Sequence, residues 1–191
     1  MRQPDFDNIV KVLKRQTPDR PTLFEFYINN KTSEILSGRK SQSGWDASWN
    51  YEMNIEVMSA AGYDYITLHG SDFSFPHFPK GQGYPIYDAE SFSAYKFMDP
   101  DKANYKRLQE CEKILPEKMK VIVFGPGGIL ENIVELVGYE NMCIMIYEEP
   151  ALFEKILDEV GSRLVRYYEN CLKYDCVGAV MVNDDWGFKT A

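Results

Sequence analysis

Residues 150–185 read PALFEKILDEVGSRLVRYYENCLKYDCVGAVMVNDD and show the pattern on which the fold prediction depends. Apolar side chains recur at every fourth position, which places them on one face of a helix: Leu152, Ile156, Val160, Leu164, Tyr168 and Leu172. Pro150 suits the first position of that helix. The apolar run 178–182 follows as a strand, and the polar residues 183–185 come directly after it. The stretch therefore predicts a helix, a buried strand and a polar cluster at the strand's carboxyl end.

Towards the N-terminus the same alternation recurs. Three more apolar runs are predicted as strands: 21–28, 63–69 and 120–124. Helices are predicted at 5–16, 49–61, 100–114 and 129–137, and loops at 29–47 and 70–98. Four strands separated by helices predict an α/β protein with a parallel sheet. A doubly wound sheet would be complete at this length, whereas a closed (β/α)8 barrel needs about 250 residues and eight strands.

Composition and charge exclude several classes of protein. With 29 acidic and 21 basic residues, the formal charge of -8 disfavours nucleic-acid binding, which depends on clustered Lys and Arg. No apolar run has the roughly 18 to 20 residues of a membrane span, and the N-terminal residues carry no signal-peptide core. We therefore expect a cytoplasmic protein that binds neither membranes nor nucleic acid. The four cysteines are scattered, and we expect reduced, mostly buried thiols: Cys111, Cys143, Cys171 and Cys176.

Three motifs occur in the order in which one known family carries them. They are Pro18-Asp-Arg-Pro21, the turn Gly125-Pro-Gly-Gly-Ile-Leu-Glu131 with Gly138-Tyr-Glu140 after it, and Asp184-Asp-Trp-Gly187. Together they resemble the uroporphyrinogen decarboxylase superfamily, whose members are single (β/α)8 barrels and include cobalamin-linked methyltransferases that act on corrinoid proteins. The resemblance implies that residues 1–191 form a single domain, the N-terminal part of a (β/α)8 TIM barrel, and supply roughly its first four β/α units.

Departures from the family pattern bear on the activity. The decarboxylases resemble one another in an arginine-rich segment after the first strand, whose cations hold substrate carboxylates, but residues 26–30 contain no arginine. Their tyrosine in the helix after the third strand is matched here by Val134. The resemblance therefore favours a methyltransferase that moves a methyl group between a small methylated compound or a corrinoid protein and an acceptor. Such enzymes hold zinc through His and Cys residues of the second half of the barrel, so no cofactor or metal ligand is expected in this chain.

Two other functions stay open at this point. One is cofactor-free decarboxylation of a tetrapyrrole acetate side chain, in which Asp72 would hold the pyrrole N–H groups. The other is an inert half-barrel that serves as an interaction module or pairs as a homodimer, because four strands leave two sheet edges unpaired.

Polar residues at the ends of the predicted strands form the candidate site, because the carboxyl ends of barrel strands carry the active site. Catalytic roles are predicted for four carboxylates: Asp72, Glu131, Asp184 and Asp185. Substrate-binding roles are predicted for four other side chains: Glu25, Tyr27, His69 and Asn183. We expect the strand-end carboxylates around one common hollow. Structural alternatives are a hydrogen-bonded histidine at His69, a helix-dipole partner at Glu131 and a tight glycine turn at residues 125–128.

Overall fold

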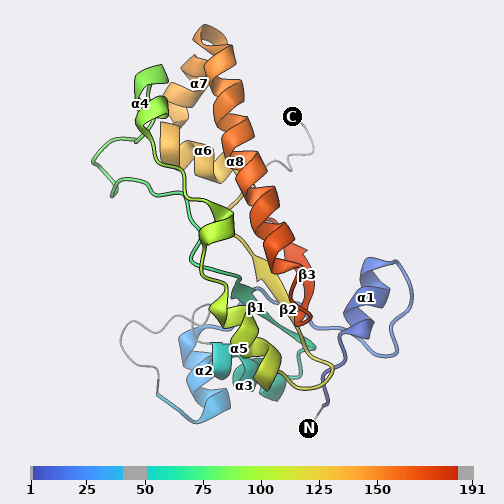
Figure 1. Ribbon diagram of the computed structural model, residues 1–191. Coiled ribbons are helices and arrows are strands. Elements are labelled where there is room, and N and C mark those ends of the chain that lie inside the picture. Colours follow the sequence, from blue (N-terminus) through green and yellow to red (C-terminus); the bar gives the residue numbers. More distant parts are fainter. Residues whose placement is uncertain (1, 41–50, 185–191) are drawn as a thin grey trace. The chain divides into compact units, whose positions relative to one another are not determined.

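The computed structural model describes residues 2–40 and 51–184 of the 191-residue chain (Figure 1). The described residues divide into two compact units. Unit 1 is drawn from Met1–Ser71, Tyr105–Phe124 and Cys171–Met181, and unit 2 from Asp72–Asn104, Gly125–Asn170 and Val182–Ala191. Along the chain, each strand of unit 1 leads into a segment of unit 2.

A three-stranded parallel sheet forms the centre of unit 1. Its strands are β1 (Tyr65–His69), β2 (Lys120–Phe124) and β3 (Val177–Met181), in the order β1-β2-β3. The register pairs His69 with Phe124 and Phe124 with Met181, so the three carboxyl ends lie at one edge of the sheet. Three of the four predicted strands and their parallel direction are therefore confirmed.

The core of unit 1 lies between the sheet and two helices, α3 (Tyr51–Ala61) and α5 (Lys106–Ile114). Its fully buried apolar side chains come from strands and helices alike: Ile66, Leu68, Val121, Val123, Met58 and Leu108. Burying each such side chain stabilises the fold by roughly 1.5–3 kcal/mol. The buried Asn54 of α3 donates from Nδ2 to the carbonyl oxygen of Thr67 at 2.8 Å, which fixes α3 along β1.

The prediction of a strand at 21–28 is wrong, since these described residues form no strand. Side chains of β1 bind their backbone instead. The hydroxyl of Tyr65 accepts from the amide of Glu25 at 2.7 Å and donates to the carbonyl of Glu25 at 2.8 Å. The hydroxyl of Thr67 donates to the carbonyl of Phe26. The apolar run is thus held beside β1 by side-chain hydroxyls, so the described sheet has three strands rather than the four of the expected half-barrel.

Two short helices of unit 1 precede α3. The first, α1 (Asp7–Leu13), lies within the predicted helix 5–16. The second, α2 (Asn30–Ser37), occupies part of the region predicted as the loop 29–47, which corrects that prediction. Asn29 caps α2 by accepting from the amide of Thr32 at 3.0 Å, and Gly38 ends it at φ 69°. Residues 41–50, which include the rest of that loop and the start of the predicted helix 49–61, lie outside the described residues.

β3 contains a glycine that lets a neighbouring ring pack against the strand. Val177 pairs with Val121 but Ala179 pairs with Ile122, so Gly178 is the extra residue of an irregular step in the ladder. A Cβ at Gly178 would lie 2.5 Å from the ring of Phe6, which is itself buried. The absence of a side chain at this position therefore allows Phe6, just before α1, to cover β3.

Unit 2 is mainly helical. It contains α4 (Ala89–Ala94), η1 (Pro100–Lys102), α6 (Ile129–Val137), α7 (Tyr139–Glu148) and α8 (Pro150–Cys171), whose last residue belongs to unit 1. The predicted helices at 129–137 and from Pro150 are confirmed. The predicted helix 100–114 is instead divided into η1 and α5, and α4 lies inside the predicted loop 70–98.

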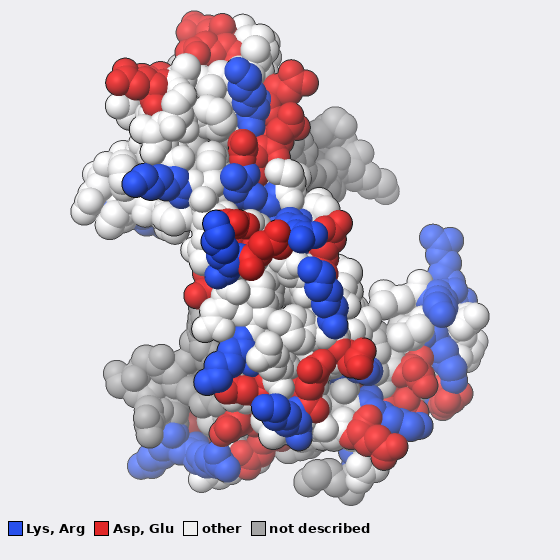
Figure 2. Space-filling model, in the orientation of Figure 1, with Lys and Arg blue, Asp and Glu red and all other residues white. Residues whose placement is uncertain are grey.

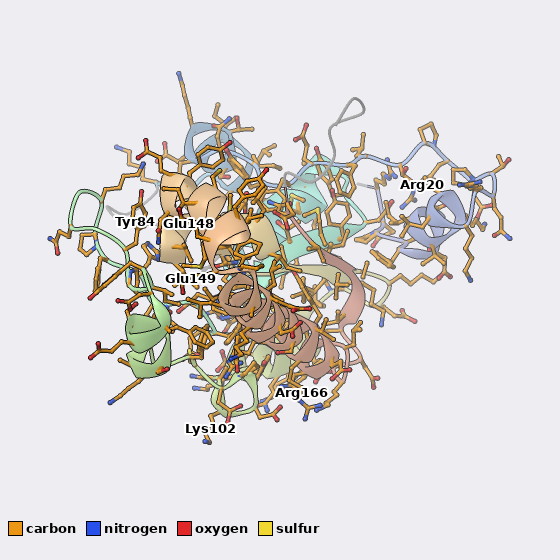
Figure 3. The ribbon with its side chains drawn as sticks, turned by 90° about the horizontal axis from the view of Figure 1, so that it is seen from above. Arg20, Tyr84, Lys102, Glu148, Glu149 and Arg166 are labelled. Atoms are coloured by element: carbon orange, nitrogen blue, oxygen red, sulfur yellow. The ribbon has the colours of Figure 1, made fainter. Side chains whose placement is uncertain are left out.

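Polar contacts join η1 to α8 within unit 2. Arg166 binds both carboxylate oxygens of Asp101, at 2.7 and 3.1 Å, and the buried Asn170 donates to Asp101 at 2.8 Å. Figure 3 labels Arg166 of α8 and Lys102, the last residue of η1. Apolar burial on the same helix follows the predicted period of four, with Ile156 and Val160 fully buried, but Leu172, the last residue of the predicted stripe, lies beyond α8 and is exposed. The α8 stripe therefore forms part of the core of unit 2.

Charged side chains of both signs lie on the surface (Figure 2), as the 29 acidic and 21 basic residues of the sequence lead one to expect. On the face that Figure 2 draws, Lys and Arg side chains are interleaved with Asp and Glu. None of the described helices combines the length and the apolar composition that a membrane crossing requires.

Candidate functional site

The first turn of α6 brings together two of the predicted catalytic carboxylates. Glu131 accepts a hydrogen bond from the amide of Gly128 at 3.2 Å, and Asp184 accepts one from the amide of Leu130 at 3.1 Å. Both carboxylates thus bind amides that a helix leaves without partners at its N-terminus, where negative charge also interacts favourably with the helix dipole.

The glycine turn before α6 is shaped by close packing. Gly127 has φ +91°, and a Cβ at Gly128 would lie 2.2 Å from both the carbonyl oxygen of Asn183 and the carboxyl carbon of Asp184. The lack of side chains therefore lets residues 183–184 approach the turn. Because two amides at this helix N-terminus already bind carboxylates of the chain, the geometry favours the tight-turn interpretation of the glycines over an anion site.

A cavity of about 660 Å³ opens beside α6 within unit 2. One wall comes from the loop after β1, with Phe75 and His77, and the other from α6, with Glu131, Asn132 and Glu135. His77 Nε2 lies 4.0 Å from a carboxylate oxygen of Glu135. This volume falls within the range of small-molecule pockets, about 300–1,000 Å³.

The sequence analysis assigned no role to Asn132 or Glu135, or to His77, which falls in the predicted loop 70–98. A usable signal was present in the helix: Glu131 and Glu135 are four residues apart on the predicted helix 129–137, so they share a face. No local pattern indicates that His77, more than fifty residues earlier in the sequence, lies against that face.

Asp72 lies in unit 2 but does not line this cavity. Its side chain is exposed, and its Oδ1 accepts from the amide of Asn104 at 2.7 Å. That hydrogen bond joins the first and last residues of the segment Asp72–Asn104. The structure therefore gives Asp72 a structural partner and places Glu131, not Asp72, at the cavity.

The predicted residues of unit 1 come from the end of β1 and the segment beside it. The ring of His69 packs on Phe124 with centroids 4.0 Å apart, and Phe26 packs on the same Phe124 ring with centroids 4.7 Å apart. The side chains of Glu25 and Tyr27 are exposed. His69 is thus the last residue of β1, whereas the backbone of Glu25 binds the hydroxyl of Tyr65, the first residue of that strand. Asp185, the remaining candidate, lies outside the described residues.

Within residues 2–40 and 51–184, which the structure describes, no group of three His, Cys, Asp or Glu side chains lies close enough together to hold a metal ion. The zinc that the sequence resemblance implies therefore has no ligand set among them. Cys111, Cys171 and Cys176 are buried, as expected, and burial raises the pKa of both Cys111 and Cys176 to about 12. These two thiols are poor nucleophiles and poor metal ligands near neutral pH.

Comparisons with known proteins give one similar structure. No protein-family model matches the chain, and no curated sequence matches it. The chain is similar in fold to a solved methyltransferase from Methanosarcina mazei, with a TM-score of 0.56 and 15% sequence identity over 92% of this chain. The match covers 57% of that protein, so the chain spans little more than half of its length. At this identity the similarity concerns the fold.

Proposed function

We propose that this chain belongs to a methyltransferase-like enzyme that moves a methyl group between a small methylated compound or a corrinoid protein and an acceptor. The observation that carries the proposal is the fold similarity to a methyltransferase over 92% of the chain. The order of the three sequence motifs supports it independently, because they resemble the superfamily that includes corrinoid-linked methyltransferases. The absence of arginine from residues 26–30 disfavours the decarboxylase alternative.

Methyl transfer is a displacement, in which the acceptor's electron pair bonds to the methyl carbon as the bond to the donor breaks. Its rate depends on holding donor, methyl carbon and acceptor in line, so positioning is the main task of the protein. We propose that His69, the last residue of β1, and Tyr27 bind the substrate in this role. We also propose catalytic roles for Asp72, Glu131, Asp184 and Asp185, and substrate-binding roles for Glu25 and Asn183.

The test uses the purified protein, methylcobalamin carrying a ¹³C-methyl group, and a thiol acceptor such as 2-mercaptoethanesulfonate. Transfer converts methylcob(III)alamin and thiolate into cob(I)alamin and a methyl thioether, seen as loss of the methylcobalamin absorption and as a new ¹³C signal. Parallel reactions offer methylated amines, methanol and methoxylated compounds as donors. Heat-denatured protein is the control.

The same preparation is also offered uroporphyrinogen. Release of carbon dioxide without methyl transfer would replace this proposal with the decarboxylase function. Inactivity towards every donor, with the protein folded and forming stable dimers, would favour the interaction-module alternative.

A further inference from the structure

The lining of the cavity beside α6 is acidic and aromatic. Carboxylates and aromatic rings face it, but among the described residues that line it there is no Lys or Arg. We propose that this cavity binds the ammonium group of a small organic cation that carries an apolar body.

Negative charge at the cavity exceeds positive charge. Glu131 and Glu135 are four residues apart on α6 and both line it. His77 is the basic side chain of the lining, and it lies beside Glu135, 4.0 Å from its carboxylate. Among the described residues, Glu131 binds a single partner, the neutral amide of Gly128, through one of its two oxygens. One imidazole thus stands against two carboxylates, which leaves one carboxylate to pair with a cation.

A buried amide adds a hydrogen-bond acceptor. Asn132 lines the cavity and is 7% exposed. Its Nδ2 donates to the carbonyls of Pro126 at 3.0 Å and Gly128 at 2.7 Å, and this fixes the orientation of the amide, because a carbonyl oxygen could not bond to those two acceptors. The Asn132 oxygen then accepts no hydrogen bond from the described chain. Because Asn132 lines the cavity, this oxygen is available to a donor that enters there, and an ammonium N–H is such a donor.

The remaining lining suits the rest of such a ligand. Phe75, which is 4% exposed, and Tyr139 present aromatic rings, and ring faces attract cations. Leu130 and Val134 add aliphatic surface. A cavity of about 660 Å³ holds more than a bare ammonium ion, so an apolar body of several carbon atoms fits the space.

The inference rests on the cavity and does not depend on methyl transfer. Isothermal titration of the full chain with 2-phenylethylammonium tests it against three comparison compounds. These are neutral 2-phenylethanol, anionic 3-phenylpropanoate, and the N,N,N-trimethyl derivative of the ammonium ion. We expect the primary ammonium ion to bind tightest, because it alone combines a positive charge with N–H donors. Equal affinity for the alcohol, or a preference for the carboxylate, would overturn the proposal.

Two variants carry the same charge change at different places. Glu135→Gln removes a carboxylate from the cavity and should weaken binding of 2-phenylethylammonium by about fivefold to tenfold. Glu154→Gln, an exposed position of α8 outside the cavity, should leave the affinity unchanged. Equal effects of the two substitutions would mean that only the net charge of the protein matters, which contradicts a site.

The location of binding is read by NMR. Addition of 2-phenylethylammonium should shift the side-chain amide signal of Asn132 and the backbone signals of Gly127 and Gly128. Shifts confined to other parts of the chain would place the ligand elsewhere and refute the assignment. Affinity for the trimethyl derivative equal to that of the primary ion would contradict the role of the Asn132 oxygen.

Discussion

Asp64, the residue before β1, is a carboxylate that is 1% exposed and bound by two guanidinium groups. Arg2 lies 3.1 Å from its Oδ2, Arg20 binds its Oδ1, and the amide of Asp5 donates to the same Oδ1 at 2.9 Å. Arg20, labelled in Figure 3, belongs to the motif Pro18-Asp-Arg-Pro21. In this chain the motif therefore fastens the N-terminal segment to the start of β1.

Replacing Asp64 by asparagine should lower the free energy of unfolding by about 3 kcal/mol, because the substitution leaves two guanidinium groups without their buried counter-charge. Urea denaturation followed by circular dichroism measures the change. Asp19→Asn is the control, since the ion pair of Asp19 with Lys11 is exposed and its loss should have little measurable effect. Equal stabilities of the two variants would show that the buried contact contributes nothing.

At the level of single residues, the sequence predicted strand-end positions for Glu131 and Asp184 but not the amides that they bind. Glu131 and Asp184 follow different strands, and their approach follows from the common direction of those strands. The partners of Asp72 and His77 depend on the path of the segment 72–104, which no period or spacing encodes. A long connection is ordered by tertiary contacts, so its side chains could not be placed in advance.

At the scale of elements, two glycines of unit 2 should respond oppositely to alanine. A methyl group at Gly128 would overlap Asn183 and Asp184, so Gly128→Ala should destabilise the protein by about 2 kcal/mol and release the amide of Leu130 from Asp184. Hydrogen exchange of that amide, measured by NMR, should become faster.

Gly161 provides the matched control within α8. A Cβ there would lie 3.6 Å from Ile129 Cδ1, an ordinary contact, and alanine is the better helix former. Gly161→Ala should therefore stabilise the protein by about 0.5–1 kcal/mol and leave the exchange of the Leu130 amide unchanged. Destabilisation by both substitutions would mean that the contact at Gly128 has no special role.

Elements with a strong local signal were the ones predicted correctly. α8 shows an apolar stripe with a period of four, and α6 lies between Gly128 and Gly138. The failures have tertiary causes. Residues 21–28 resemble a strand in composition. Their backbone groups at Glu25 and Phe26, however, form hydrogen bonds with side-chain hydroxyls of β1 and not with the backbone of a neighbouring strand. α2 has only eight residues, and its signal in the sequence was the cap at Asn29 and the stop at Gly38.

At the scale of the whole molecule, the two units differ in their buried thiols and phenols. Among the described residues, unit 1 contains more such groups whose pKa is raised by burial than unit 2 does. In unit 1, burial raises the pKa of Cys111 and Cys176 from 9.0, and that of Tyr65 from 10.0, to about 12. In unit 2, burial raises the pKa of Tyr95 to about 12. Each of these groups has a higher pKa when folded than when unfolded, so its contribution to stability is complete below the unfolded pKa.

That contribution is lost as the pH rises from the unfolded pKa towards about 12, because the unfolded chain then releases protons that the folded chain keeps. The thiols begin this loss near pH 9, so unit 1 should unfold at a lower alkaline pH than unit 2. Methyl NMR during a titration from pH 8 to 12 measures the order directly. The native signals of Ile66 and Val121, fully buried in unit 1, should disappear before those of Ile133 and Ile156 in unit 2. Simultaneous loss, or the reverse order, would show that these buried groups do not determine the alkaline stability of the molecule.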